Sequence, residues 1–338
     1  MRTDIFYLGR HAVALGTLVA CAIFAAPGAP ANAKGKITIF DVPNAIETYG
    51  GSINIHGVMA AIYDDQTAEH GYLRAADGTI TTFDPPGSVY TPEASINDGG
   101  VIVGTYLDSN YLQHGYLRAV DGSFTSFDVP DAEGTFGNAL NNKGAITGYY
   151  FVDAIRHGYV RAADGTVSEF DPTGSVDTEP FSINDKGEVA GFYSDQDENS
   201  YGFVRNKDGA ISKIQVRGNI ISLALSVNGK GAVTGWYYDA NLVSHCYLRE
   251  PDGTITAFDP PGSQSSSCGS INDHGDIDGF YTASNGKVES FIRKAGGSFK
   301  SYYIKGTTYI STGQINDKDA IAGSVQIGNG DDQGLLRK

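Results

Sequence analysis

Four histidines occupy the same position of a recurring phrase, and they are the first residues whose type and spacing suggest chemistry. They are His70, His114, His157 and His245, and each begins a His-Gly-Tyr or His-Cys-Tyr segment. Imidazole binds metals and transfers protons near neutral pH. If these segments are equivalent strands of a closed repeat, equivalent positions lie more than about 10 Å apart, too far for the ligands of one metal. We therefore expect each histidine to make a structural hydrogen bond between repeats.

Carboxylates recur in a second phrase, as phenylalanine-aspartate pairs. The pairs are Phe40-Asp41, Phe83-Asp84, Phe127-Asp128, Phe170-Asp171 and Phe258-Asp259. A catalytic carboxylate belongs to one special constellation, so a motif repeated this often favours a structural role. We expect the phenylalanines to pack between repeats and the aspartates to accept hydrogen bonds in a turn before proline. Trp236, the only tryptophan, is expected in the core, and the chain contains no GxSxG, HExxH, P-loop or paired CxxC motif.

A third recurring feature is a hydroxyl six residues before a repeated asparagine. The hydroxyls belong to Thr48, Thr91, Thr135, Thr178, Ser222 and Ser266, and Ile310 interrupts the series. One hypothesis places them at the mouth of a central channel, where they bind a polar ligand. The other has each hydroxyl form a hydrogen bond within its own loop.

Acidic residues and a tyrosine accompany these hydroxyls. Tyr49, Glu93 and Glu179 are further candidate ligand-binding residues, and Glu47 and Asp177 add negative charge to the same rim. Acidic loops can hold calcium, but the DxDxDG spacing is missing, so we expect a solvated surface with calcium as the alternative. No residue is assigned to catalysis or to metal binding.

The elements that position these residues follow from a repeat of 43 or 44 residues. Each repeat ends its third phrase with an arginine, as in HGYLR, HGYVR or HCYLR. The arginines are Arg74, Arg118, Arg161, Arg205, Arg249, Arg293 and Arg337. Each unit contains four short phrases rich in β-branched and aromatic residues, without helical periodicity, so one supersecondary unit is used seven times.

Four short antiparallel strands in about 44 residues match a blade of a β-propeller. The first two phrases join through turns such as NDGG and NNKG, in which Asn and Asp before Gly are expected to supply positive φ. The segment from Lys36 to Asp41 resembles a fourth strand, whereas the chain ends after a third strand. We predict an all-β, seven-bladed propeller over residues 34–338, closed by this N-terminal strand, with an open β-solenoid as the alternative.

Loop lengths distinguish the two faces of this propeller. Longer segments join each fourth strand to the next first strand, and variable loops join the second and third strands. Both kinds should project from one face, while the tight Asn-Asp-Gly and Asp-Gly hairpins occupy the other. Variable loops on a rigid scaffold usually carry binding, so the long-loop face is the expected ligand site.

Residues 1–33 have the order of a secretory signal peptide: basic residues, an apolar stretch from Ala12 to Ala26, then small residues, with cleavage expected after Ala33. A lipoprotein anchored at Cys21 is the alternative. The formal net charge is −15, which argues against a nucleic-acid partner. We expect no membrane span and a monomer. Whether Cys246 and Cys268 form a disulfide is left open.

The phrases SINDGGVIVGTY and HGYLR resemble a bacterial extracellular repeat family named for its His-Ala-Phe (HAF) motif, in which an Ile-Asn-Asp-x-Gly-x-Val-x-Gly segment comes first. The resemblance covers all seven units, although the motif here is His-Gly-Tyr or His-Cys-Tyr. It implies a secreted protein and supplies no catalytic residues.

Three functional hypotheses follow. The leading one is a secreted or periplasmic, non-catalytic protein that binds a glycan or a protein on its long-loop face. The second is an enzyme similar to propeller lyases and hydrolases, with a metal-assisted site over the channel, for which Tyr49, Glu93 and Glu179 are the candidates. The third is an envelope scaffold anchored as a lipoprotein. Fold alone does not choose among them.

Overall fold

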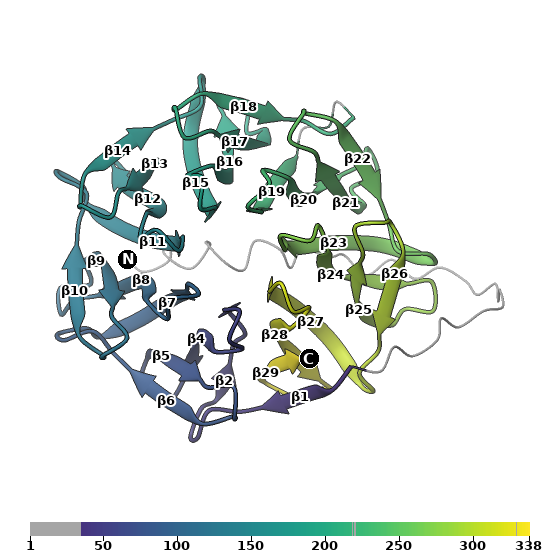
Figure 1. Cartoon of the computed structure of the whole chain (residues 1–338), viewed down its shortest axis with the longest axis horizontal. Coiled ribbons are helices and arrows are strands. Elements are labelled where there is room, and N and C mark those ends of the chain that lie inside the picture. The colour runs from purple at the N-terminus through teal and green to yellow at the C-terminus, as the bar shows by residue number, and fades with distance from the viewer. Residues whose placement is uncertain (1–34, 218, 220, 329) are drawn as a thin grey trace. The chain divides into compact units, whose positions relative to one another are not determined.

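A computed structural model of the chain describes residues 35–338 except 218, 220 and 329. The predicted leader, its cleavage site and Cys21 lie outside the described residues. The described chain is all-β and forms seven four-stranded antiparallel blades in a ring, as predicted (Figure 1). We number the blades 1 to 7 in the order of their inner strands. No helix in this part of the chain is long and apolar enough to cross a membrane.

Within each blade the strands run in order from the axis to the rim (Figure 1). The inner strands are β2 (Glu47–Thr48) with β3 (Ser52–Ile53), β7 (Tyr90–Ile96), β11 (Gly134–Leu140), β15 (Ser175–Ile183), β19 (Ser222–Val227), β23 (Ser263–Ile271) and β27 (Thr307–Ile315). The second strands are β4 (Met59–Asp64), β8 (Ile102–Leu107), β12 (Ile146–Val152), β16 (Val189–Asp195), β20 (Val233–Tyr238), β24 (Ile277–Ala283) and β28 (Ile321–Ile327).

The third strands carry the repeated arginine at their ends. They are β5 (Glu69–Arg74), β9 (Gln113–Arg118), β13 (Ile155–Arg161), β17 (Ser200–Arg205), β21 (Ser244–Arg249), β25 (Val288–Arg293) and β29 (Asp332–Arg337). The outer strands are β6 (Ile80–Phe83), β10 (Phe124–Phe127), β14 (Val167–Phe170), β18 (Ile211–Ile214), β22 (Ile255–Phe258), β26 (Phe299–Tyr302) and β1 (Ile37–Phe40).

The ring closes through β1, as the sequence predicted. This strand pairs antiparallel with β29, from Ile37 opposite Arg337 to Phe40 opposite Gly334, and completes blade 7. The inner strand of blade 1 differs from the others because it is interrupted between β2 and β3. Gly50 lies there so close to β28 that an added Cβ would be 1.9 Å from the carbonyl carbon of Gly323. Only glycine allows that approach.

Aromatic rings and arginines hold adjacent blades together. Six of the seven repeated arginines place their guanidinium over a ring from the outer strand of the preceding blade, at distances from 4.0 Å for Arg337 to 5.1 Å for Arg118. Arg249 is the exception, because Ile214 ends the preceding outer strand. The expected packing of the phenylalanines between blades is confirmed, and cation–π contacts explain why arginine recurs with them.

The repeated tyrosine of the third strand explains the glycine of the second strand. Tyr72, Tyr116, Tyr159 and Tyr247 are fully buried, and each hydroxyl donates a hydrogen bond of 2.7–2.9 Å to a carbonyl of its own inner strand. The side chain passes beneath the intervening second strand. An added Cβ at Gly104 would lie 2.7 Å from the Tyr116 oxygen, so a larger residue there would block the contact.

The repeated asparagines form a closed belt of hydrogen bonds around the ring. The Nδ2 of each donates to the backbone carbonyl of the asparagine in the next blade, at 2.8–3.3 Å, and Asn316 closes the belt by donating to Asn54. The Oδ1 atoms accept from backbone N–H groups two and four residues further on, as in Asn228 with Lys230 and Ala232. The belt therefore shapes each hairpin and joins it to the next blade.

One detail of these hairpins corrects the sequence prediction. The positive φ belongs to the last turn residue, the glycine, as at Gly100 and Gly144, and not to the Asn or Asp before it. In blade 7 Asp319 takes this position with φ of 61°. The physical reason is that the side chain of the first asparagine accepts backbone hydrogen bonds and so forms an Asx turn. The residue with positive φ is then the last residue of the turn.

A disulfide joins two neighbouring blades. Cys246 of β21 in blade 5 bonds to Cys268 of β23 in blade 6, with their Cα atoms 5.4 Å apart. Both cysteines are buried. The question that the sequence left open is answered in favour of a bond, which crosslinks the two blades covalently.

Candidate ligand-binding face

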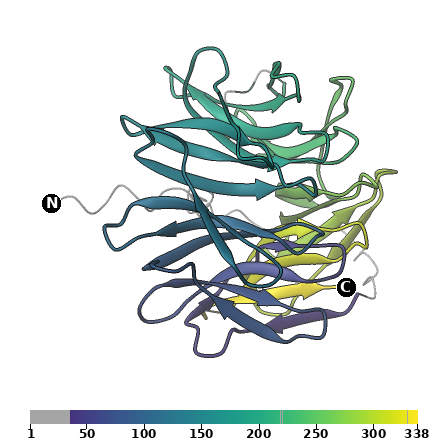
Figure 2. The same ribbon diagram turned by 60° about the vertical axis from the view of Figure 1, so that its left-hand side comes forward.

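The strand registers place the blade crossings and the loops between second and third strands at the same edge of each sheet. Tyr90 at the start of β7 pairs with Leu107 at the end of β8, and Phe83 at the end of β6 pairs with Gly71 near the start of β5. We call this edge the long-loop face and the opposite edge the hairpin face. Figure 2, turned by 60° from Figure 1, shows loops at both edges of the blades.

Exposed apolar side chains gather on the long-loop face. Among the described residues, the large hydrophobic side chains that are exposed there are Ile46, Val89, Tyr111, Leu112, Val152, Ile155, Val176, Leu242 and Tyr303. Leu242 and Tyr111 are 72% and 62% exposed at loop tips, whereas Val120 is exposed on the hairpin face. Apolar surface concentrated on one side of a protein is typical of an interaction face.

The structure corrects the expected position of the hydroxyls. All six are at most 1% exposed, so they lie beneath the surface and do not form a rim. Their bonds hold the crossings. The Thr48 and Thr135 hydroxyls accept from the backbone N–H of Val42 and Val129. The remaining hydroxyls donate, Thr91 to Asp84, Ser266 to Asp259, Ser222 to the carbonyl of Ile214, and Thr178 to Ser175. These contacts agree with the hypothesis that each hydroxyl forms a hydrogen bond within its own loop.

The histidines form the expected structural hydrogen bonds, but within a blade and not between blades. His70 Nδ1 lies 2.8 Å from Asp84, which follows the outer strand of the same sheet, and the His114, His157 and His245 pairs are equivalent. The antiparallel pairing of β5 and β6 brings the two residues together. The contact between blades comes from the carboxylate, because Asp84 also accepts from Thr91 of blade 2. Asp259 likewise accepts from Ser266 of blade 6, so these two aspartates bridge adjacent blades.

One charged cluster on the long-loop face has no counterpart in the other repeats. Arg156 of β13 in blade 3 reaches the start of β15 in blade 4, where Asp177 and Glu179 bind its guanidinium. The Nε donates to Asp177 at 2.8 Å, and the two terminal nitrogens bind one carboxylate each. Burial opposes the charge of Arg156, but these carboxylates outweigh it and raise its pKa. The guanidinium is therefore held as a fixed cation within a net negative group.

Aromatic rings surround this cluster. The Arg156 guanidinium carbon lies 5.7 Å from the Tyr149 ring and 5.8 Å from the Phe192 ring. Phe136 stacks on Tyr149 with centroids 4.5 Å apart, and Phe181 stacks on Phe192 at 5.6 Å. Phe136, Phe181 and Phe192 are half-buried and keep part of their surface in solvent. We call Arg156, Asp177, Glu179 and these aromatic residues the Arg156 cluster.

The other two candidates lie elsewhere on the ring. The Tyr49 hydroxyl donates to Glu47 in blade 1, and burial together with that carboxylate raises its pKa. Glu93 in blade 2 accepts from the Thr105 hydroxyl at 3.0 Å. Of the three residues named for a site over the channel, the structure therefore brings only Glu179 into the Arg156 cluster. Among the residues described, no group of three or more His, Cys, Asp or Glu is arranged to hold a metal ion.

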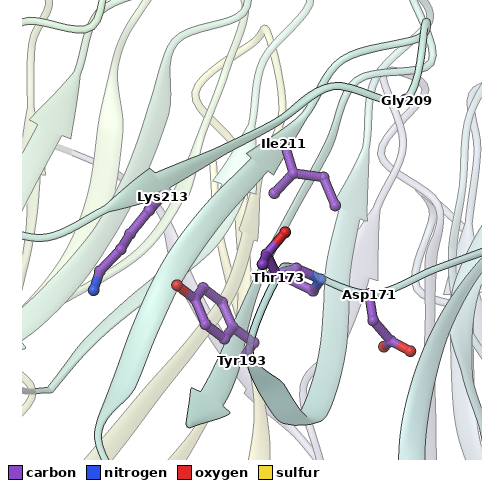
Figure 3. A pocket seen from close by; sticks show the side chains of 7 residues that line it. Asp171, Thr173, Tyr193, Gly209, Ile211 and Lys213 are labelled. Carbon is purple, nitrogen blue, oxygen red and sulfur yellow. The ribbon is translucent and has the colours of Figure 1, made fainter.

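A separate open hollow of about 350 Å³ lies at the margin of blade 4 (Figure 3). It is lined by Asp171 and Thr173 of the crossing and by Tyr193, Ile211 and Lys213 of the blade. Two of its polar groups are engaged elsewhere, since Asp171 binds His157 and Lys213 lies 3.2 Å from the centre of the Tyr201 ring. We favour the Arg156 cluster because it combines accessible aromatic surface with a fixed charge.

Sequence reasoning overlooked Arg156, although one signal was present. The residue before the repeated histidine position differs in every blade except 4 and 5, and only blade 3 has an arginine there. A single residue that differs from the repeat is easily mistaken for neutral sequence variation. Its importance appears only when the fold sets it against the next inner strand.

Solved structures with the same fold include enzymes. The β-propeller domain of the Trilobed protease from Pyrococcus furiosus matches with a TM-score of 0.62 and 10% identity, over 86% of this chain and 96% of that one. A streptogramin B lyase matches with a TM-score of 0.61 and 14% identity, over 89% of this chain and 97% of that one. Virginiamycin B lyase from Staphylococcus aureus matches with a TM-score of 0.60 and 15% identity, over 90% of this chain and 100% of that one. Such low identities show a shared fold alone. No protein-family profile and no curated protein sequence matches the chain.

Proposed function

We propose that this chain is an exported, non-catalytic binding protein that holds a glycan against the Arg156 cluster on its long-loop face. The observation that carries the proposal is the break in the repeat. One pair of adjacent blades combines partly exposed aromatic rings with a guanidinium fixed by two carboxylates. The signal-peptide pattern and the resemblance to HAF repeats support export.

The chemistry of the cluster suits a sugar. The apolar C–H face of a pyranose packs on aromatic rings, and Phe136, Phe181 and Phe192 offer such surfaces. Sugar hydroxyls both donate and accept hydrogen bonds. Asp177 supplies acceptors and Arg156 supplies donors in a fixed geometry, so little rotamer freedom is lost on binding. The exposed apolar residues on the same face extend the contact area for an oligosaccharide.

Isothermal titration calorimetry of the mature protein against a panel of neutral, acidic and amino oligosaccharides tests this proposal. We expect one class to bind, and Phe192→Ala to weaken it about tenfold, equivalent to ~1.4 kcal/mol. Phe280→Ala is the matched control, because Phe280 takes the equivalent place in blade 6 and contacts Tyr309 away from Arg156. Equal losses in both variants, or a panel without any binder, would contradict the proposal.

Mass spectrometry of the bound glycan after prolonged incubation addresses catalysis. We expect its mass to stay unchanged. Cleavage products that disappear in the Glu179→Gln variant would instead support the lyase or hydrolase alternative and overturn the non-catalytic part of the proposal.

A further inference from the structure

One loop tip on the long-loop face exposes an aromatic ring from an unusual backbone conformation. Tyr111, between β8 and β9 of blade 2, is 62% exposed and has φ of 63°. A bulky residue rarely adopts this left-handed conformation, and an aromatic ring in water gives up the gain from its burial. Glu198 takes the same turn position in blade 4, also with φ of 63°, so the turn itself does not require an aromatic residue. The strained backbone and the exposed ring together favour a binding role for Tyr111.

Three further apolar side chains belong to the same part of the surface. Leu112 and Val89 are 48% and 37% exposed. The Tyr90 ring is partly exposed, and its centroid lies 6.2 Å from that of Tyr111. The Val89 N–H donates to the Leu107 carbonyl at 2.7 Å, which holds the crossing against the end of β8. We call Val89, Tyr90, Tyr111 and Leu112 the Tyr111 patch.

Five carboxylates border the Tyr111 patch. The crossing to blade 3 adjoins it, because an added Cβ at Gly134 would lie 2.6 Å from the side-chain oxygen of Gln113, the residue after Leu112. The Leu112 N–H donates to Asp108, and this bond lowers the pKa of Asp108, so its carboxylate stays charged. The five acids lie on the loop that carries Tyr111 and on the crossings before and after it: Asp84, Asp108, Asp128, Asp131 and Glu133.

The sequence places no basic residue on this part of the face to offset these acids. The long-loop segments around blades 1 and 2, residues 41–48, 64–69, 84–90, 107–113 and 128–134, contain neither lysine nor arginine. Further round the ring, Arg217, Lys287 and Lys305 lie in the corresponding segments. The negative potential of the long-loop face is therefore concentrated around the Tyr111 patch.

We infer that the Tyr111 patch docks a basic segment of a protein partner, one that carries arginine or lysine among apolar residues. Tyrosine beside apolar side chains is typical of the centre of a protein interface, and charged residues form its rim. The five carboxylates complement basic side chains of the partner and guide their approach. The two tyrosine rings also bind cations, a contact that Arg74 already makes with Phe40 inside this protein.

Charge favours a basic protein segment over the alternative occupants. Nucleic acid and anionic lipid surfaces are repelled by the carboxylates. A second copy of the chain has the same formal net charge of −15, which opposes its approach. The patch belongs to blade 2, whereas the Arg156 cluster joins blades 3 and 4, so the inference does not depend on glycan binding.

Fluorescence anisotropy of the mature protein with three labelled dodecapeptides tests the inference. The peptides share leucine and tyrosine at alternate positions and differ at the others, which are all arginine, all glutamine or all glutamate. We expect the arginine peptide to bind at least about tenfold more tightly than the glutamine peptide, and its affinity to fall between about 50 and 300 mM NaCl. Tyr111→Asn should weaken its binding about tenfold without destabilising the fold, because asparagine tolerates positive φ.

Two further variants separate docking from a general attraction of charge. Tyr303→Asn is the matched control, because Tyr303 is also exposed on this face but its ring centre lies 4.4 Å from the protein's own Lys287, so affinity should be kept. Asp131→Asn combined with Glu133→Gln should weaken the arginine peptide and reduce its salt dependence. Equal affinities for the arginine and glutamine peptides, or equal losses in Tyr111→Asn and Tyr303→Asn, would overturn the inference. So would a wild-type dimer in sedimentation that Tyr111→Asn dissociates, since a second copy would then cover the patch.

Discussion

The two faces of this propeller are built from the same repeats, yet they differ in how strictly they repeat. On the hairpin face every blade contributes the same asparagine to one closed belt of hydrogen bonds. On the long-loop face the buried hydroxyls also recur, but the surface above them varies, and Arg156 with its carboxylates occurs once. The belt requires the same residue in every unit, because each asparagine donates to the next one. A site for one ligand needs residues that differ from the repeat in only one place, so we look for function where the repeat pattern is interrupted.

The largest effect is expected from breaking the belt. Asn228→Ala removes the bond from Nδ2 to the Asn272 carbonyl and the two bonds that Oδ1 accepts, all at 3.0 Å. The bonds to the Asn272 carbonyl and from the Ala232 N–H are buried, and the bond from the Lys230 N–H is partly buried. Because two of these losses leave a buried backbone group unsatisfied, we expect the free energy of unfolding to fall by about 3 kcal/mol. Urea denaturation followed by circular dichroism measures this.

The neighbouring Lys230→Ala serves as the control for the belt. Lys230 is exposed and contributes only its backbone N–H to Asn228, so its side chain should be dispensable. A loss below about 1 kcal/mol in Asn228→Ala, or equal losses in both variants, would show that the belt does not distinguish the hairpin face.

The sequence predicted what depends on local signals repeated many times. Four strands per unit, the closing role of the segment at Ile37–Phe40 and the packing of Phe83 and Phe127 between blades all follow from patterns within about 44 residues. The belt could not be predicted, because Asn54 and Asn97 meet only once the blades are placed side by side. For the same reason the sequence alone does not decide between a rim and a loop-bonding role for the repeated hydroxyls, such as Thr135, which are buried.

The candidate site was predicted only in part, because its residues occur once in the chain and are not part of the repeat pattern. The acidic residues at the start of the inner strands were noticed, and Glu179 among them belongs to the Arg156 cluster. Its partner Arg156 lies 23 residues earlier on another blade. No spacing in one sequence reveals such a contact, because the strand that carries Arg156 is related to β15 only through the twist and packing of adjacent sheets.

A moderate effect is expected from the long-loop face, where Thr135→Val tests the role of the buried hydroxyls. The change removes the acceptor of the Val129 N–H at constant volume, in a site that is 0% exposed. We expect a loss of about 1.5 kcal/mol in unfolding free energy and no change in ligand affinity. Thr125→Val, at an exposed position of the preceding outer strand, should cost little. A variant of Thr135 that keeps its stability but loses affinity would return the hydroxyls to the ligand site.

The smallest effect compares two arginines, of which Arg205 has the ring contact and is buried, and Arg249 lacks it and is partly exposed. Arg205 and Arg249 each donate from NH1 to the next residue's carbonyl at 3.3 Å, but only Arg205 lies over a ring, that of Phe170 at 4.9 Å. Leucine at position 205 should therefore cost about 0.5–1 kcal/mol more than leucine at position 249, measured by urea denaturation. Equal costs would mean that arginine recurs for the packing of its aliphatic stem alone. A larger loss of stability at position 205 would show that the cation–π contact stabilises the blades in which it occurs, and that blade 5 tolerates its absence. The asparagine belt differs, because every blade contributes its member.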